Sequence, residues 1–199
     1  MKSDVISLKN TTDISTILNE AEAVAAYRKL NDKNVLRLRL LAEELISMLP
    51  NLLDNYHGNF WIENEDRNFE MHVELYVANP IALNKERILE LSKSGKNIAY
   101  SGIMGKIRFV AEMMLNTSYC DPALINAPYY YSSGLAACST GNYYCEWSLQ
   151  NYQTAVNSEK DKSSEEWDEL EKSIIGNLAD DVIVGVFENK VDIIIKKSF

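Results

Sequence analysis

The sequence is poor in the residues that build metal centres and disulfide-linked scaffolds. Its 199 residues include 3 cysteines and 2 histidines, and Cys120, Cys138 and Cys145 have no C-x-x-C spacing. An odd number of thiols at irregular spacing predicts no zinc site. We expect reduced cysteines without a functional role, as is usual in a cytosol. His57 and His72 have no sequence neighbours that suggest a catalytic triad.

Basic residues and long apolar runs are also scarce. The 20 lysines and arginines face 29 aspartates and glutamates, so the formal net charge is −9. Proteins that follow nucleic-acid phosphates or anionic membranes present basic surfaces, so this charge argues against both targets. No apolar run approaches the length of a membrane-spanning helix, and the first ten residues have no signal-peptide core. These absences predict a cytoplasmic protein with neither a nucleic-acid nor a membrane partner.

Repeats, heptads and a complete catalytic motif are absent as well. A chain of 199 residues with 46% hydrophobic and 25% charged residues is typical of a globular protein that can bury its own core. We therefore predict a single domain over residues 1–199. A Tyr-rich insertion at about 116–142 interrupts it, because proline and glycine punctuate that stretch and periodicity is lost there.

The most periodic segment of the chain covers residues 34–54. On a helix of about 3.6 residues per turn, its apolar residues form one broad stripe, at Leu38, Leu41, Leu45, Met48, Leu49 and Leu52. Glu43 points away from this stripe, whereas Arg37 and Glu44 lie along its edge, where a side chain is half-buried and can face a pocket. Pro50 removes a backbone donor and predicts a kink or a restart of the helix. The plain interpretation is a core helix with an incidental Glu44 at its border.

Alternation of apolar and polar residues predicts the strands. In residues 69–77 every second side chain is apolar, which is typical of a strand with one buried face, and we expect His72 to be solvated on the other face. Further strands are predicted at 5–8, 60–63, 143–152, 182–187 and 191–195. Residues 64–68 are interpreted as a hairpin loop. The strand at 182–187 is apolar on both faces and belongs inside a sheet.

Helical spacing accounts for most of the remaining chain. Helices are predicted to begin after the cap candidates at 10–13, and to cover 83–91, 107–114 and 164–178. The order of helices and strands predicts an α+β fold. Its architecture is a two-layer α/β sandwich, with one mixed, largely antiparallel sheet and helices packed on one face.

Residues 41–49, L-A-E-E-L-I-S-M-L, resemble the N-box helix of the GHKL, or Bergerat-fold, ATPases. That superfamily includes histidine-kinase catalytic domains and anti-sigma-factor kinases, and its N-box reads E-L-x-x-N-A. The Glu orients the hydrolytic water or acts as a base, and the Asn helps to bind magnesium. A hairpin, a lid and a glycine-rich phosphate site at a helix start follow, and G-I-M-G-K at 102–106 has the corresponding place.

The resemblance implies one catalytic residue and five nucleotide-binding residues. Glu44 would be the catalytic acid or base, and the binding residues would be Ser47, Asn79, Gly102, Gly105 and Lys106. The cofactor that the family implies is ATP with magnesium.

The chain departs from the family pattern at two residues that contact the nucleotide directly, the magnesium-binding Asn and the Asp that reads adenine. Met48 stands where the magnesium-binding Asn should follow Glu44, and Ser47 stands there if Glu43 is the acid. After the second hairpin strand the family has D-x-G-x-G, whose Asp reads the adenine amine. This chain has V-A-N-P, in which only Asn79 offers a hydrogen-bonding side chain. We therefore expect weak or absent ATP binding and no metal site.

These departures predict a regulatory or protein-binding module of a bacterial-type cytoplasm, with a protein partner or self-association, and they leave open whether the chain is an enzyme. One alternative is a functional ATP-binding protein with slow ATPase or anti-sigma-factor-type kinase activity. Another is a small-ligand or interaction protein that uses the Tyr-rich insertion. Residues 119–152 hold seven of the 11 tyrosines, and we expect Tyr129, Tyr130 and Tyr131 to contribute to an association surface. The competing explanation is that these rings pack the insertion onto the domain.

Overall fold

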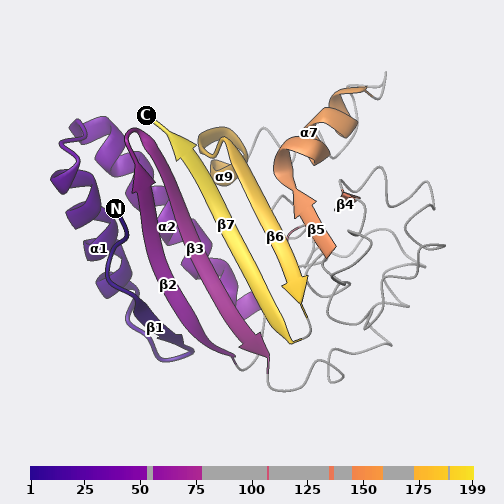
Figure 1. Cartoon of the computed structure of the whole chain (residues 1–199), viewed down its shortest axis with the longest axis horizontal. Coiled ribbons are helices and arrows are strands. Elements are labelled where there is room, and N and C mark those ends of the chain that lie inside the picture. The colour runs from indigo at the N-terminus through magenta and orange to yellow at the C-terminus, as the bar shows by residue number, and fades with distance from the viewer. Residues whose placement is uncertain (53–55, 78–106, 108–134, 137–144, 159–172, 188) are drawn as a thin grey trace.

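The computed structural model describes residues 1–52, 56–77, 107, 135–136, 145–158, 173–187 and 189–199. It contains a seven-stranded sheet of order β1-β2-β3-β7-β6-β5-β4, in which every neighbouring pair is antiparallel (Figure 1). The α+β prediction with one largely antiparallel sheet is therefore confirmed. The predicted helix at 83–91, most of the helix at 107–114 and most of the insertion lie outside the described residues.

The first two helices begin and pack as their sequences predict. Helix α1 (Ile14–Tyr27) follows Asp13, whose carboxylate accepts a hydrogen bond from the Ser15 amide at 3.0 Å. Helix α2 (Asp32–Leu52) is the striped helix, and its inward side chains are buried at Leu38, Leu41, Leu45, Met48 and Leu49. Helix α2 does not restart at Pro50 but continues to Leu52. Pro50 cannot donate to the carbonyl of Ile46, but it lies in the last turn and only two residues of the helix follow it.

The hairpin that follows α2 is longer than predicted. Strands β2 (Tyr56–Glu65) and β3 (Asn68–Val77) pair up to Glu65 and Asn68, so only Asp66 and Arg67 form the turn. The predicted loop at 64–68 is therefore wrong at both ends. The buried Asn64 amide donates 3.0 Å hydrogen bonds to the carbonyls of Asp66 and Asn68, and Asp66 has a φ of 53°. Asn64 and Asn68 are residue types that favour turns, but here they belong to the strands. The side chain of Asn64 stabilises the two-residue turn from its place in β2.

The C-terminal strands lie inside the sheet, as their β-branched residues predict. Strands β6 (Asp181–Phe187) and β7 (Lys190–Ser198) form a hairpin, with β7 paired to β3 and β6 paired to β5 (Cys145–Ser148). The edges of the sheet are β1 (Ile6–Lys9) and β4 (Leu135–Ala136). Residues from both ends of the chain thus share one sheet.

Serine side chains cap two helices that begin at places the sequence patterns do not predict. The strand predicted at 143–152 ends at Ser148, where helix α7 (Leu149–Ser158) begins, because the Ser148 hydroxyl accepts a hydrogen bond from the Asn151 amide at 3.3 Å. Most of the helix predicted at 164–178 lies outside the described residues, and its described part begins only after Ser173, which is extended with a ψ of 128°. Ser173 caps the short helix α9 (Ile174–Leu178) by accepting from the Gly176 amide at 3.0 Å.

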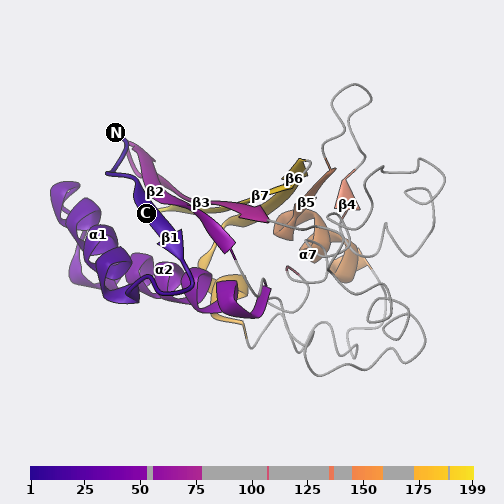
Figure 2. The same cartoon turned by 90° about the horizontal axis from the view of Figure 1, so that it is seen from below.

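Helices α1, α2 and α7 lie on the same side of the sheet (Figure 2). The inward side chains of the strands join those of α1 and α2 in one buried apolar cluster. The alternate residues of the strands face the other side and are mostly half-buried or exposed. None of the described helices is both long enough and apolar enough to cross a membrane.

Candidate functional site

Helix α2 presents the predicted catalytic residue at the edge of the core. Glu44 is half-buried and Glu43 is exposed, as the geometry of the stripe predicts. Ser47 is also exposed, and its hydroxyl donates a hydrogen bond to the backbone carbonyl of Glu44 at 2.9 Å. Met48 is 6% exposed and packs into the core. The helix brings Glu44 and Ser47 together but provides no oxygen ligand at position 48.

The other predicted binding residues, Asn79, Gly102, Gly105 and Lys106, lie outside the described residues. In the part of the chain that the structure describes, no group of three or more His, Cys, Asp or Glu side chains could hold a metal ion.

Two aromatic residues near the Tyr-rich insertion belong to the core. The side chains of Trp147 and Tyr152 are 0% and 1% exposed, and their ring centroids lie 6.1 Å apart. Their burial supports the packing explanation at these two positions. Tyr129, Tyr130 and Tyr131 lie outside the described residues.

The face of the sheet opposite the helices carries an aromatic stack that no local sequence pattern predicts. Trp61 of β2 pairs with His72 of β3, and their rings are parallel within 2° at a centroid distance of 4.9 Å. The ammonium group of Lys2 lies 4.2 Å from the centroid of the Trp61 ring. The His72 side chain is only 14% exposed, so the expectation of a solvated histidine is wrong. Both residues occupy polar-face positions, but only the strand register places them side by side.

Carboxylates surround this stack. The Trp61 indole donates a hydrogen bond to Glu63 at 2.8 Å, which lowers the pKa of Glu63, and Lys2 lies 3.3 Å from the same carboxylate. The Nε2 atom of His72 is buried without a hydrogen bond, 3.5 Å from the Glu70 carboxylate. Burial lowers the pKa of His72, although the negative charges of Glu63 and Glu70 act in the opposite direction. We therefore expect a neutral imidazole near neutral pH.

A second polar network lies further along the same face. The Lys190 ammonium contacts Asp192 at 2.9 Å and Glu74 at 3.1 Å, and the hydrogen bond to Asp192 is the main cause that raises the pKa of Lys190 to about 12. Burial alone would raise the pKa of Glu74, but hydrogen bonds from Tyr76 and Lys190 outweigh it and lower this pKa. These groups satisfy one another, which is the arrangement of a fixed surface network and not of a reactive acid or base.

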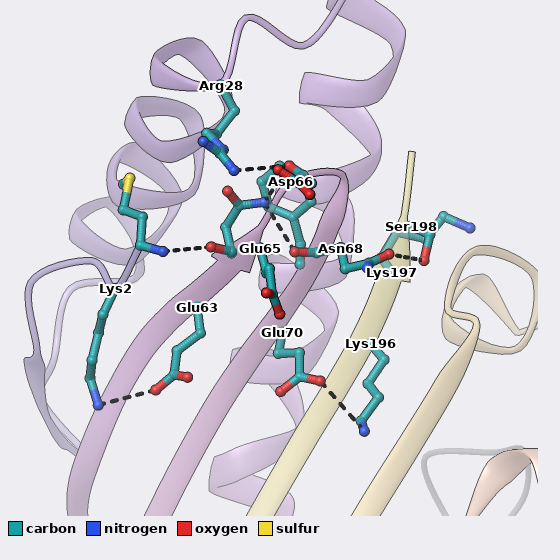
Figure 3. Close-up of a pocket in the computed structure, with 13 residues that line it drawn as sticks. Lys2, Arg28, Glu63, Glu65, Asp66, Asn68, Glu70, Lys196, Lys197 and Ser198 are labelled. Carbon is teal, nitrogen blue, oxygen red and sulfur yellow. Dashed lines mark hydrogen bonds and ion pairs between the residues drawn. The ribbon is translucent and has the colours of Figure 1, made fainter.

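A hollow of about 780 Å³ lies at the end of the β2–β3 hairpin, where β7 also ends (Figure 3). Its cationic side chains already have partners. Lys196 lies 3.5 Å from Glu70, and Arg28 donates to the Asp66 carbonyl at 3.2 Å. Side chains of both charges line the hollow, so it has no strong preference for a ligand of either charge.

No protein-family model, curated protein or solved structure matches this chain.

Proposed function

We propose that this chain is a GHKL-like domain that has lost most of its catalytic apparatus and acts as a regulatory, protein-binding module in the cytoplasm. The order of helix α2, the β2–β3 hairpin and the terminal β6–β7 hairpin within one sheet supports this proposal. Helices on a single face of an antiparallel sheet are also what the resemblance implies. ATP binding is weak or absent in this proposal.

The observation that carries the proposal is the burial of Met48. Met48 follows Glu44 at the spacing of the family's magnesium-binding Asn, but it is 6% exposed and packs in the apolar core. A thioether is a poor ligand for magnesium, which prefers oxygen. The alternative pair, Glu43 and Ser47, is exposed to solvent, and the Ser47 hydroxyl is already engaged with the backbone.

The binding free energy that the missing contacts would supply is large enough to explain weak ATP binding. Each hydrogen bond to a charged partner contributes roughly 1.5–3 kcal/mol. The chain has no Asn at position 48 and has Asn79 in place of the adenine-reading Asp. Losing both contacts lowers the affinity for nucleotide by several powers of ten.

Calorimetric titration of the full chain with ATP, with and without magnesium, tests the proposal. We expect no saturable heat in the micromolar range. Magnesium-dependent binding at micromolar ATP or tighter would overturn it.

The half-burial of Glu44 favours one second candidate, an ATP-binding protein with slow ATPase or kinase activity. If turnover is observed, Glu44→Ala should abolish it, whereas Glu43→Ala should leave it unchanged because Glu43 faces solvent. That pair of variants separates a catalytic glutamate from an incidental one.

A further inference from the structure

The open face of the sheet is organised in rows that cross the strands. Paired residues of antiparallel neighbours lie on the same face, so the register defines each row. One row is apolar and aromatic, and contains Trp61, His72, Ile194 and Ile183. These four side chains come from four neighbouring strands and are half-buried. At about 4.8 Å between strands, the row is about 14 Å long.

Acidic rows flank the apolar row on both sides, about 7 Å away along the strands. On one side, Glu63 pairs with Glu70, followed by Lys196 and Asp181. On the other side, the carboxylates of the row are those of Glu74, Asp192 and Glu146. Three ammonium groups, those of Lys2, Lys190 and Lys196, lie among these six carboxylates. The Asp181 carboxylate is engaged by the Ser148 hydroxyl and the Gln150 amide, so the other five carboxylates face three ammonium groups and the balance of the face is negative.

We propose that this face docks a basic amphipathic helix of a partner protein, laid across the strands along the apolar row. This inference rests on the proposed function as a protein-binding module and names its surface and the chemistry of its partner. The apolar stripe of such a helix contacts the row from Trp61 to Ile183, and lysine or arginine on both flanks meets the acidic rows.

The direction of the row selects a helix over an extended segment. A strand laid across the face would find side chains and not a sheet edge, so its backbone groups would lose water without gaining partners. A helix satisfies its own backbone, and about 10 residues at about 1.5 Å each cover the row.

The charge of the face excludes other occupants. A second copy of the chain has a net charge of −9 and the same acidic face, so two faces repel each other. Nucleic acid is repelled for the same reason.

The test uses a fluorescein-labelled synthetic peptide of about 14 residues, long enough to exceed the row, with leucine on one helical stripe and lysine on both flanks. Fluorescence anisotropy measures its binding to the full chain at physiological salt. The control peptide has glutamate in place of lysine, and we expect it not to bind.

Two charge-matched variants test the location. In one, Glu63→Lys and Glu70→Lys reverse charge beside the Trp61–His72 stack, and in the other Glu20→Lys and Glu43→Lys do so on the helical layer. Each replacement of Glu by Lys adds two positive charges, so both variants change the net charge from −9 to −5. We expect at least about tenfold weaker binding for the first and less than about threefold for the second, because only the first removes contacts.

Equal weakening in both variants overturns the proposal, since long-range charge alone would then explain binding. Absence of binding by the lysine peptide also overturns it. So does a sedimentation profile in which wild type self-associates and the Glu63/Glu70 variant does not.

If the first variant fails to fold, Glu63→Gln with Glu70→Gln and the matched Glu20→Gln with Glu43→Gln replace the reversals. Failure here leaves the nucleotide titration of the proposed function unaffected, so the two conclusions stand or fall separately.

Discussion

The imidazole of His72 stacks on the indole of Trp61 with an interplanar angle of 2° and a centroid distance of 4.9 Å. Only 14% of the His72 side chain is exposed, and its Nε2 atom is buried without a hydrogen bond. A protonated imidazole would have to keep its charge in this partly desolvated position, with the Lys2 ammonium on the ring of the same tryptophan. The stack therefore favours the neutral form of His72 and couples its protonation to folding.

The first prediction concerns pH. Burial lowers the pKa of His72 below its ordinary value of 6.5, so the unfolded chain takes up this proton at a higher pH than the folded chain does. Stability contributed by the neutral imidazole is therefore complete above pH 6.5 and declines as the pH falls toward the folded pKa. His72→Gln removes this proton uptake, so its free energy of unfolding should fall less between pH 7 and pH 5 than that of wild type. Urea unfolding at both pH values measures this, and parallel changes in the two proteins would refute it.

A second prediction concerns the cap between β6 and α7. The Asp181 carboxylate accepts hydrogen bonds from the Ser148 hydroxyl, the Gln150 amide and the Val182 amide at 3.0, 3.0 and 2.8 Å. Asp181→Ala leaves these donors without their partner and should lower the free energy of unfolding by about 1–3 kcal/mol. Asp181→Asn keeps an acceptor and should cost less. Chemical denaturation compares the variants, and equal losses for Ala and Asn would contradict the capping role.

A third prediction concerns Gly58 in β2. A Cβ atom at this position would lie 2.0 Å from the backbone carbonyl oxygen of Glu74, so the two strands cannot keep their spacing around a side chain. Gly58→Ala should therefore lower the free energy of unfolding by about 1–3 kcal/mol or more. The neighbouring His57 is exposed and stacks on Tyr76 at a centroid distance of 5.5 Å, so His57→Ala should cost no more than about 1 kcal/mol. Thermal and urea unfolding measure both, and a neutral Gly58→Ala would show that the strands separate at little cost.

Much of the fold was predictable because burial leaves a local periodicity in the sequence. The stripe from Leu38 to Leu49 predicted α2 and its packing, and the alternation in β3 predicted which side chains enter the core. The half-buried position of Glu44 followed from the same helical spacing. Local patterns therefore predicted one candidate site as well as the elements that hold it.

Contacts between distant residues were not predictable in this way. The cap between Ser148 and Asp181 joins residues 33 positions apart, and without it residues 149–152 fit a strand as well as a helix. The rows of the open face depend on the register of five strands, in which a one-residue shift would turn every side chain over. The Trp61–His72 stack and its acidic flanks therefore emerged only from the paired strands.

The last prediction restores the magnesium ligand that the resemblance implies. Met48→Asn places an amide at a position that is 6% exposed and lined by apolar residues of the core. Losing the buried thioether and burying an amide without partners should lower the free energy of unfolding by about 2–5 kcal/mol. Ser47→Asn is the matched control, because Ser47 is exposed and the new amide stays in water, so its cost should remain within about 0.5 kcal/mol.

The same two variants, titrated with ATP and magnesium, separate two explanations for weak nucleotide binding. If position 48 is committed to the core, Met48→Asn loses stability and gains no affinity. Micromolar binding by Met48→Asn at wild-type stability would show instead that the side chain can turn toward a nucleotide. The helix edge at Glu44 would then be an ATP site that needs only its magnesium ligand restored, and the proposal of a degenerate binding module would be wrong.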